Sequence, residues 1–182
     1  MKKYLEMFRK VGTLKKTDRE GWKRFGIEDP ESVADHSFRA SFLALVLGEK
    51  FDLDGFKLLK LLLVHDLAES EIGDITPENP ISEEEKLARE EEVIEDISRS
   101  FDIDIDIKKL WKEFELGDTR EAIIARDIDR LERILQALEY EEENPERDLS
   151  EFFFEGKSEL ESKEIKEFLN EILDEKFKSK KR

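Results

Sequence analysis

The chain has 182 residues, of which 44% are charged and 38% hydrophobic, and its formal net charge is −16. This length is sufficient to bury a core and fits a single domain covering residues 1–182. So negative a surface disfavours binding to nucleic acids or anionic membranes. The absence of cysteine excludes disulfides, thiolate nucleophiles and cysteine-bound zinc. The abundance of Glu, Lys, Ile and Leu suggests a thermophile, in which surface ion pairs are common.

The longest fully apolar run, FLALVL at 42–47, is far too short to cross a bilayer. The N-terminal segment MKKYLEMFRK is amphipathic and lacks the apolar region of a signal peptide. These two observations predict a soluble protein of the cytoplasm.

Helical periodicity dominates the chain and predicts an all-α bundle of about six to seven helices. The second helix carries Phe38, Phe42, Leu45 and Val46 on one side, and the third is apolar nearly all round, which is typical of a buried central helix. The stretch FDIDIDI alternates like a strand, but it is short and follows a long helix, which favours a connecting turn. The predicted helices cover about residues 2–12, 32–50, 55–69, 82–100, 106–116, 119–143 and 158–178.

The chain has two histidines, His36 and His65, and both have acidic neighbours. Asp66 follows His65 directly, and in a helix Glu69 would lie one turn after both of them. Unpaired charges at the end of an apolar helix are costly. Either the three groups neutralise one another or a metal ion lies between them, and the residues alone leave both interpretations open. Imidazoles combined with carboxylates suit Mn, Fe, Co, Ni or Zn better than Ca.

Three segments together resemble the HD-domain metal phosphohydrolases, and most closely their 5′-deoxynucleotidase branch. They are PESVADHS (30–37), LLLVHDLAESEIGDITP (61–77) and RDIDRLERILQALEYE (126–141). The resemblance extends over residues 4–175. It implies a helical HD domain, a divalent transition metal, a homodimer, and hydrolysis of deoxyribonucleoside 5′-monophosphates to deoxynucleoside and phosphate.

The segment DID offers two candidates for the distant acidic metal ligand of this family. Asp127 lies at the margin of the apolar stripe of its helix, whereas Asp129 projects about 140° from the centre of that stripe. Periodicity alone therefore selects Asp127 as the buried acid, but the match through ILQALEYE selects Asp129, which we adopt. The positions that match the family's metal ligands are His36, His65, Asp66 and Asp129.

Other positions match the family's catalytic and substrate contacts. Glu69 matches the acid that handles the attacking water, and Asp74 matches an acid near the sugar. Glu69, Asp74 and the carbonyl of Ile75 could also hold a second metal. Trp22 matches an aromatic side chain that packs against the sugar and helps to exclude ribose. In some bacterial relatives an Arg precedes it, whereas Gly21 does so here, so that contact is missing or supplied by another residue.

A phosphate substrate needs basic partners in so acidic a protein. Arg126 and Arg133 lie one turn on either side of Asp129 and could bind phosphate, although solvent-exposed ion pairs are an equally good interpretation. The segment EFFF at 151–154 is expected in the core or at a dimer contact.

Three functions compete with the monophosphatase. The first keeps the fold and hydrolyses a nucleoside triphosphate or (p)ppGpp. The second is a dinuclear-iron HD oxygenase, which needs additional histidines that this sequence does not contain. The third is a non-catalytic metal-binding interaction module. The segments GW, PESV and GDI.P favour the monophosphatase, and a module without activity would not need Glu69.

Overall fold

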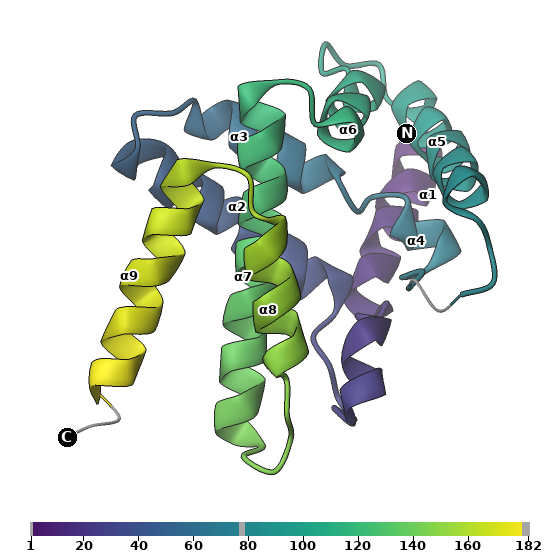
Figure 1. The fold of residues 1–182 in the computed structure, drawn as a ribbon. Helices are drawn as coiled ribbons and strands as arrows, with labels where there is room; N and C mark the ends of the chain where they lie inside the picture. Colours follow the sequence, from purple (N-terminus) through teal and green to yellow (C-terminus); the bar gives the residue numbers. More distant parts are fainter. Residues whose placement is uncertain (1, 77–78, 180–182) are drawn as a thin grey trace.

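The computed structural model describes residues 2–76 and 79–179, and it is built from helices (Figure 1). Those residues form nine α-helices and two short 3-10 helices without a β-strand, which confirms the predicted all-α fold. The helices outnumber the six to seven expected because two interhelical segments form helices of their own. In chain order they are α1 (Lys2–Val11), η1 (Gly12–Lys16), η2 (Glu20–Phe25), α2 (Val33–Lys50), α3 (Gly55–Val64), α4 (Glu69–Ile72), α5 (Glu83–Ser100), α6 (Ile107–Leu116), α7 (Arg120–Glu143), α8 (Ser150–Glu159) and α9 (Lys163–Ser179).

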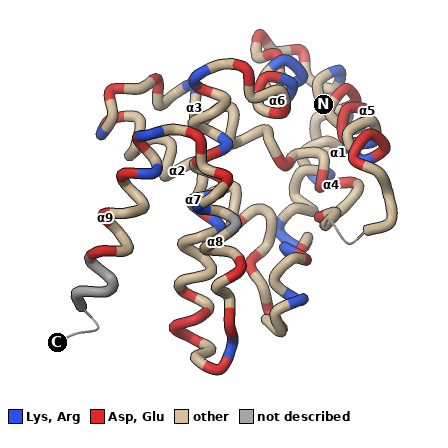
Figure 2. The backbone as a smooth tube through the Cα atoms, viewed as in Figure 1, with Lys and Arg blue, Asp and Glu red and all other residues tan. Residues whose placement is uncertain are grey.

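Helix α7 is central to the bundle (Figure 1). Helices α2 and α3 pack against each other and against α7, and α8 folds back along α7. Helix α6 contacts α3, α5 and α7, while α9 reaches α7 from the other side of the view. Figure 2 places many Asp and Glu residues on the outer helix α5 and at the end of α7. Among the described helices, none combines the length and apolar character that a membrane crossing requires.

Aliphatic side chains from α2, α3, α5, α6, α7 and α9 form the main core. Burying each Leu or Ile of such a core stabilises the fold by about 1.5–3 kcal/mol. Trp111 of α6 belongs to this core and is 2% exposed. A smaller cluster lies between η2, α7 and α8, and it contains Trp22, Ile27, Ala137, Tyr140 and Leu149.

The caps at two helix starts agree with the sequence. Ser82 accepts a hydrogen bond from the Glu85 amide at the start of α5, and Thr119 accepts one from the Ala122 amide at the start of α7. These bonds satisfy amides that have no partner within the first turn of a helix. Gly117 ends α6 with φ 60°, a backbone conformation that favours glycine.

Four apolar side chains of α2, namely Phe38, Phe42, Leu45 and Val46, are exposed instead of facing the core. Phe38 is 74% exposed and Phe42 57%, whereas the opposite face, with His36, is buried. A Cβ added to Gly48 would lie 2.6 Å from the Cα of Gly55 at the start of α3. The missing side chain therefore lets α2 and α3 approach closely, which selects the small-residue face of α2 for the interior.

The third helix ends at Val64, five residues before its predicted end. Residues 65–68 form tight turns, and the Glu69 amide donates to the Asp66 carbonyl, three residues earlier, at 3.1 Å. Such bonds wind the chain more tightly than an α-helix does. His65, Asp66 and Glu69 therefore do not lie on one continuous helix as the sequence suggested.

The predicted start of the last helix at Ser158 is wrong, because Ser158 lies inside α8 and α9 begins at Lys163. Asp127 of α7 determines this turn. Its carboxylate accepts hydrogen bonds from the amides of Glu161 at 2.9 Å and Ser162 at 2.6 Å. An acid on a distant helix thus satisfies amides at the entrance to α9, which local sequence patterns do not reveal.

Candidate active site

Three elements bring the candidate metal ligands together. His36 lies in the first turn of α2, which a complete capping box begins. His65 and Asp66 lie in the tight turn after α3, and Asp129 lies in the middle of α7. Close packing of α2, α3 and α7 brings these segments to one point of the bundle.

The four side chains converge through one atom each. His36 Nε2 lies 2.9 Å from Asp129 Oδ1 and 3.3 Å from His65 Nε2, and His65 Nε2 lies 3.1 Å from Asp66 Oδ2. His36 Nε2 lies 3.8 Å from Asp66 Oδ2, and His65 Nε2 lies 3.8 Å from Asp129 Oδ1. Ligands that each lie about 2.0–2.2 Å from one ion are separated by about 3–3.5 Å. The donor set and its spacing therefore fit a divalent transition metal.

Both imidazoles turn Nε2 toward this point because Nδ1 is engaged elsewhere. His65 Nδ1 donates to the Leu62 carbonyl at 2.8 Å, and His36 Nδ1 forms a short hydrogen bond with Glu132 Oε2. A carbonyl oxygen accepts and does not donate, so the His65 proton is on Nδ1 and the Nε2 lone pair faces inward. This outer hydrogen bonding is typical of metal-binding histidines.

The acids and imidazoles of the cluster shift one another's pKa values. Burial and Arg19 lower the pKa of His36, but Glu132 and Asp129 outweigh them and raise it to about 9. Burial raises the pKa of Asp66, whereas His65 and Arg19 outweigh it and lower that pKa to about 2. The cluster therefore carries an ionised carboxylate at neutral pH and strongly favours a positive charge at its centre.

The two candidates for the distant acid have different positions. Asp127 is fully buried, as periodicity predicts, but it faces Ser162 and the start of α9. Asp129 reaches the two histidines, as the family match predicts. Periodicity identifies the buried acid correctly, but that acid faces the start of α9 and not the two histidines.

Glu69 and Asp74 line a cleft of about 350 Å³ beside the four donors. Glu69 is 7% exposed, and its Oε2 has no hydrogen-bond partner among the described residues. Burial and the nearby Asp66 raise its pKa well above the usual value. Asp74 Oδ2 accepts a hydrogen bond from the Glu20 amide at 2.6 Å, and burial raises its pKa. Both acids thus bind a proton more tightly than exposed carboxylates do.

Trp22 is both a cleft-lining residue and part of the smaller core cluster. It is 2% exposed, and its ring contacts Tyr140 edge-on and Phe152 at a centroid distance of 4.3 Å. Its Nε1 donates to Glu31 Oε1 at 3.1 Å. Little of the ring is therefore accessible from the cleft that it lines.

The two arginines predicted to bind phosphate lie in different surroundings. Arg133 lines the cleft and pairs with Glu159 at 3.1 Å. Arg126 lines a neighbouring depression, and its guanidinium donates to the Glu115 carbonyl at 3.4 Å. The structure therefore brings Arg133 closer to the cleft than Arg126.

Sequence reasoning missed Arg19, which lines the cleft three residues before Trp22. Its NH1 lies 3.4 Å from Asp66 Oδ2. Burial lowers its pKa, but Asp66, Asp74 and other acids outweigh that effect and raise it. Lys86 of α5, also missed, lines the same cleft. This arginine stands three residues before the tryptophan instead of directly before it, in the segment between η1 and η2.

Comparison with known proteins identifies the class. The HD domain family matches residues 11–173, so the chain belongs to the HD domain family. This confirms the resemblance deduced from the three sequence segments.

Among its curated relatives is the 5′-deoxynucleotidase HDDC2 of Dictyostelium discoideum, 40% identical over 152 residues, which cover 79% of this chain and 80% of the relative. The 5′-deoxynucleotidase HDDC2 of Homo sapiens is 37% identical over 172 residues, covering 92% and 83% of the two chains. A conserved hypothetical protein from Pyrococcus furiosus has a similar structure, with a TM-score of 0.78 and 32% identity over 94% of this chain and 97% of that one.

Proposed function

We propose that the chain is a metal-dependent 5′-deoxynucleotidase, which hydrolyses deoxyribonucleoside 5′-monophosphates to deoxynucleosides and inorganic phosphate. The observation that carries this proposal is the convergence of four nitrogen and oxygen donors beside the unpaired carboxylate oxygen of Glu69. The activity named for the relatives supports it.

The residues that would hold the metal are His36, His65, Asp66 and Asp129. A divalent ion such as Mn, Co, Ni, Fe or Zn lowers the pKa of a bound water and polarises a phosphoryl oxygen. The protein holds both imidazoles with Nε2 inward, which prepares them to bind such an ion.

A single ion agrees best with the described side chains. Asp129 approaches both histidines, at 2.9 and 3.8 Å, whereas the Asp74 carboxylate already accepts a hydrogen bond from the Glu20 amide at 2.6 Å. A second ion held by Glu69, Asp74 and the Ile75 carbonyl therefore remains a prediction with less support.

Two acids are assigned to proton transfer. Glu69 takes a proton from the attacking water while the water oxygen bonds to phosphorus. The bond between phosphorus and O5′ breaks in the same step. The leaving O5′ needs a proton, and Asp74, whose pKa burial raises, is the group we assign to donate it. Burial raises the pKa of both acids, and the base role goes to Glu69 because its Oε2 is unpaired among the described residues.

Sugar selection is assigned to Trp22. Its ring lines the cleft with Nε1 already bonded to Glu31, and packing against Tyr140 and Phe152 holds it in place. A rigid apolar wall offers no hydrogen-bond partner to a ribose 2′-hydroxyl, which would lose its hydration there.

Arg19 and Arg133 are the cations we assign to the substrate phosphate, with Lys86 beside them. Replacing Arg19 with glutamine should raise KM about 10- to 100-fold, because a charged hydrogen bond contributes about 1.5–3 kcal/mol. Steady-state kinetics would measure this, with metal content checked because Arg19 contacts Asp66.

Lys23→Gln is the matched control for Arg19→Gln, because Lys23 lies in the same segment but pairs with Asp18 and Glu20 on the surface. An unchanged KM in Arg19→Gln would remove Arg19 from the phosphate site.

We also propose a homodimer in the cytoplasm. An apolar groove of about 590 Å³ follows α1, α2 and α3, and it includes the exposed Phe8, Phe38 and Phe42. Exposed apolar surface of this kind is typical of a protein interface. It supports pairing through α2 more than through EFFF, where Phe152 packs against Trp22 and Phe25.

Phosphate release from nucleoside 5′-monophosphates tests the proposed function. With Mn²⁺ or Co²⁺ added, we expect release from deoxyribonucleoside monophosphates at a higher kcat/KM than from their ribose counterparts. Absence of release from every monophosphate would overturn the proposal, and release confined to triphosphates or (p)ppGpp would assign a different substrate.

A further inference from the structure

We propose that Glu132 is a positioning residue that fixes the tautomer and the orientation of His36, and that Arg39 and Gln136 hold Glu132 in place. This inference concerns metal binding and rests on the proposed ligand set. The side chains of Glu132 and His36 are both 0% exposed. A buried carboxylate is costly unless each of its oxygens has a partner, so the partners of Glu132 indicate its role.

Helix α7 holds the His36 ring at both of its nitrogens. Asp129 Oδ1 lies 2.9 Å from Nε2, and Glu132 Oε2 forms the short hydrogen bond with Nδ1. Asp129 and Glu132 are three residues apart and therefore lie on the same face of α7. A carboxylate oxygen only accepts hydrogen bonds. When Nε2 binds the ion that Asp129 shares, the proton of a neutral His36 is on Nδ1, where the Glu132 carboxylate accepts its hydrogen bond.

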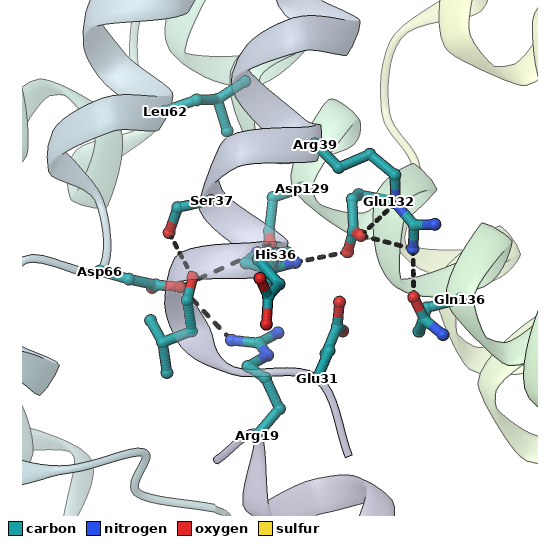
Figure 3. A network of polar contacts seen from close by, with 12 residues as sticks. Arg19, Glu31, His36, Ser37, Arg39, Leu62, Asp66, Asp129, Glu132 and Gln136 are labelled. Atoms are coloured by element: carbon teal, nitrogen blue, oxygen red, sulfur yellow. Dashed lines mark hydrogen bonds and ion pairs between the residues drawn. The ribbon is translucent and has the colours of Figure 1, made fainter. Parts of the chain in front are cut away.

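The other oxygen of Glu132 is held by Arg39, one turn after His36 on α2 (Figure 3). Arg39 Nε donates to Glu132 Oε1 at 2.7 Å. The same guanidinium donates to Gln136 Oε1 and to Glu139 Oε2, both at 2.6 Å. Glu132, Gln136 and Glu139 follow one another along α7 at spacings of four and three residues, so they form a stripe on one face of that helix. One arginine thus aligns α2 with α7 along the stripe that begins at Glu132.

Positioning explains this arrangement better than a second metal site does. Glu31, His36 and Glu132 also lie close enough to hold an ion. However, both oxygens of Glu132 already have partners, and the Arg39 guanidinium supplies the positive charge. Glu31 is likewise engaged, because its Oε1 accepts a hydrogen bond from Trp22. The cluster is complete without an ion.

Replacing Glu132 with glutamine provides the test. Arg39 requires an acceptor, so it should retain the amide oxygen and turn the amide NH₂ toward His36 Nδ1. That favours the tautomer with the proton on Nε2, where it blocks metal binding. We expect the affinity for Mn²⁺ or Zn²⁺, measured by competition with a fluorescent chelator, to fall about 10- to 100-fold.

The histidine rings give a readout that a purely structural role would not change. Because the chain contains two histidines, a ¹⁵N-histidine spectrum of the Zn²⁺-loaded protein reports only His36 and His65. We expect the Nδ1–H signal of His36 to shift or disappear in Glu132→Gln, while the His65 signals stay unchanged.

Glu139→Gln is the matched control, because Glu139 binds the same arginine but is 53% exposed and does not contact His36. It should keep the metal affinity of the unmodified chain. Glu132→Asp, which keeps the charge but withdraws the carboxylate, replaces Glu132→Gln if the latter does not fold, and it should also lose affinity.

Metal affinity within twofold of the unmodified chain together with unchanged His36 signals would overturn the positioning role. An equal loss of metal affinity in Glu139→Gln would also overturn it, because any disturbance of Arg39 would then weaken metal binding, whether or not the contact between Glu132 and His36 changed. Both measurements are independent of hydrolysis. A failure of the proposed enzymatic activity therefore leaves them interpretable.

Discussion

Replacing Asp129 with alanine should abolish metal binding, whereas replacing Asp127 with alanine should leave the metal in place. Asp129 Oδ1 approaches His36 and His65, and removing it leaves three protein ligands and takes a negative charge away from the two buried imidazoles. Metal content of the purified proteins and a chelator competition would measure the difference, which we expect to exceed about 100-fold in affinity.

Asp127→Ala should instead lower stability. Asp127 accepts hydrogen bonds from the amides of Glu161 and Ser162 and from Ser162 Oγ, and it pairs with Arg130 at 3.0 Å. Removing one partner of a buried charged network typically costs about 3–5 kcal/mol. Thermal unfolding of the two variants would separate these effects. Loss of metal in Asp127→Ala with retention in Asp129→Ala would reverse our assignment of the fourth ligand.

Replacing Glu69 with glutamine should lower kcat by about 10²- to 10⁴-fold, which is the usual contribution of a general base. The amide keeps the shape of the side chain but accepts no proton. Metal affinity should remain because His36, His65, Asp66 and Asp129 are untouched. Stability should be unchanged or higher, since the variant removes a buried carboxylate whose Oε2 is unpaired.

The pH dependence of the reaction provides a second test of Glu69 as the general base. A general base acts only when deprotonated, so kcat/KM should rise with pH as Glu69 loses its proton. Because burial and Asp66 raise its pKa well above the usual value, this rise should occur at a higher pH than that of an exposed glutamate. Glu71→Gln, which changes an adjacent acid paired with Lys10 on the surface, is the control and should keep full activity. Full activity in Glu69→Gln would exclude the assigned role.

Local patterns identified many elements of the fold correctly. Ser82 and Thr119 begin the helices where capping predicts, and Gly117 ends α6. Such signals depend on neighbouring residues only, so they can be read without a structure. Periodicity also identified Asp127 as a buried acid. The family resemblance, carried by whole segments, supplied the candidate ligands that periodicity did not select.

Contacts between distant residues decided the rest. Asp127 determines where α9 starts, and the contact between Gly48 and Gly55 determines which face of α2 is buried. Arg19 reaches the cleft from the segment between η1 and η2, where its amide donates to the Glu31 carbonyl at 3.0 Å.

The sequence by itself determined the all-α class, most helix ends and the family, because these depend on local capping, periodicity and whole matching segments. The tertiary structure alone decided the orientation of His36. The residue that holds its Nδ1, Glu132, lies 96 positions away and is fixed there by the packing of α2 against α7. Short-range patterns carry no information about a hydrogen bond that forms only when two helices meet.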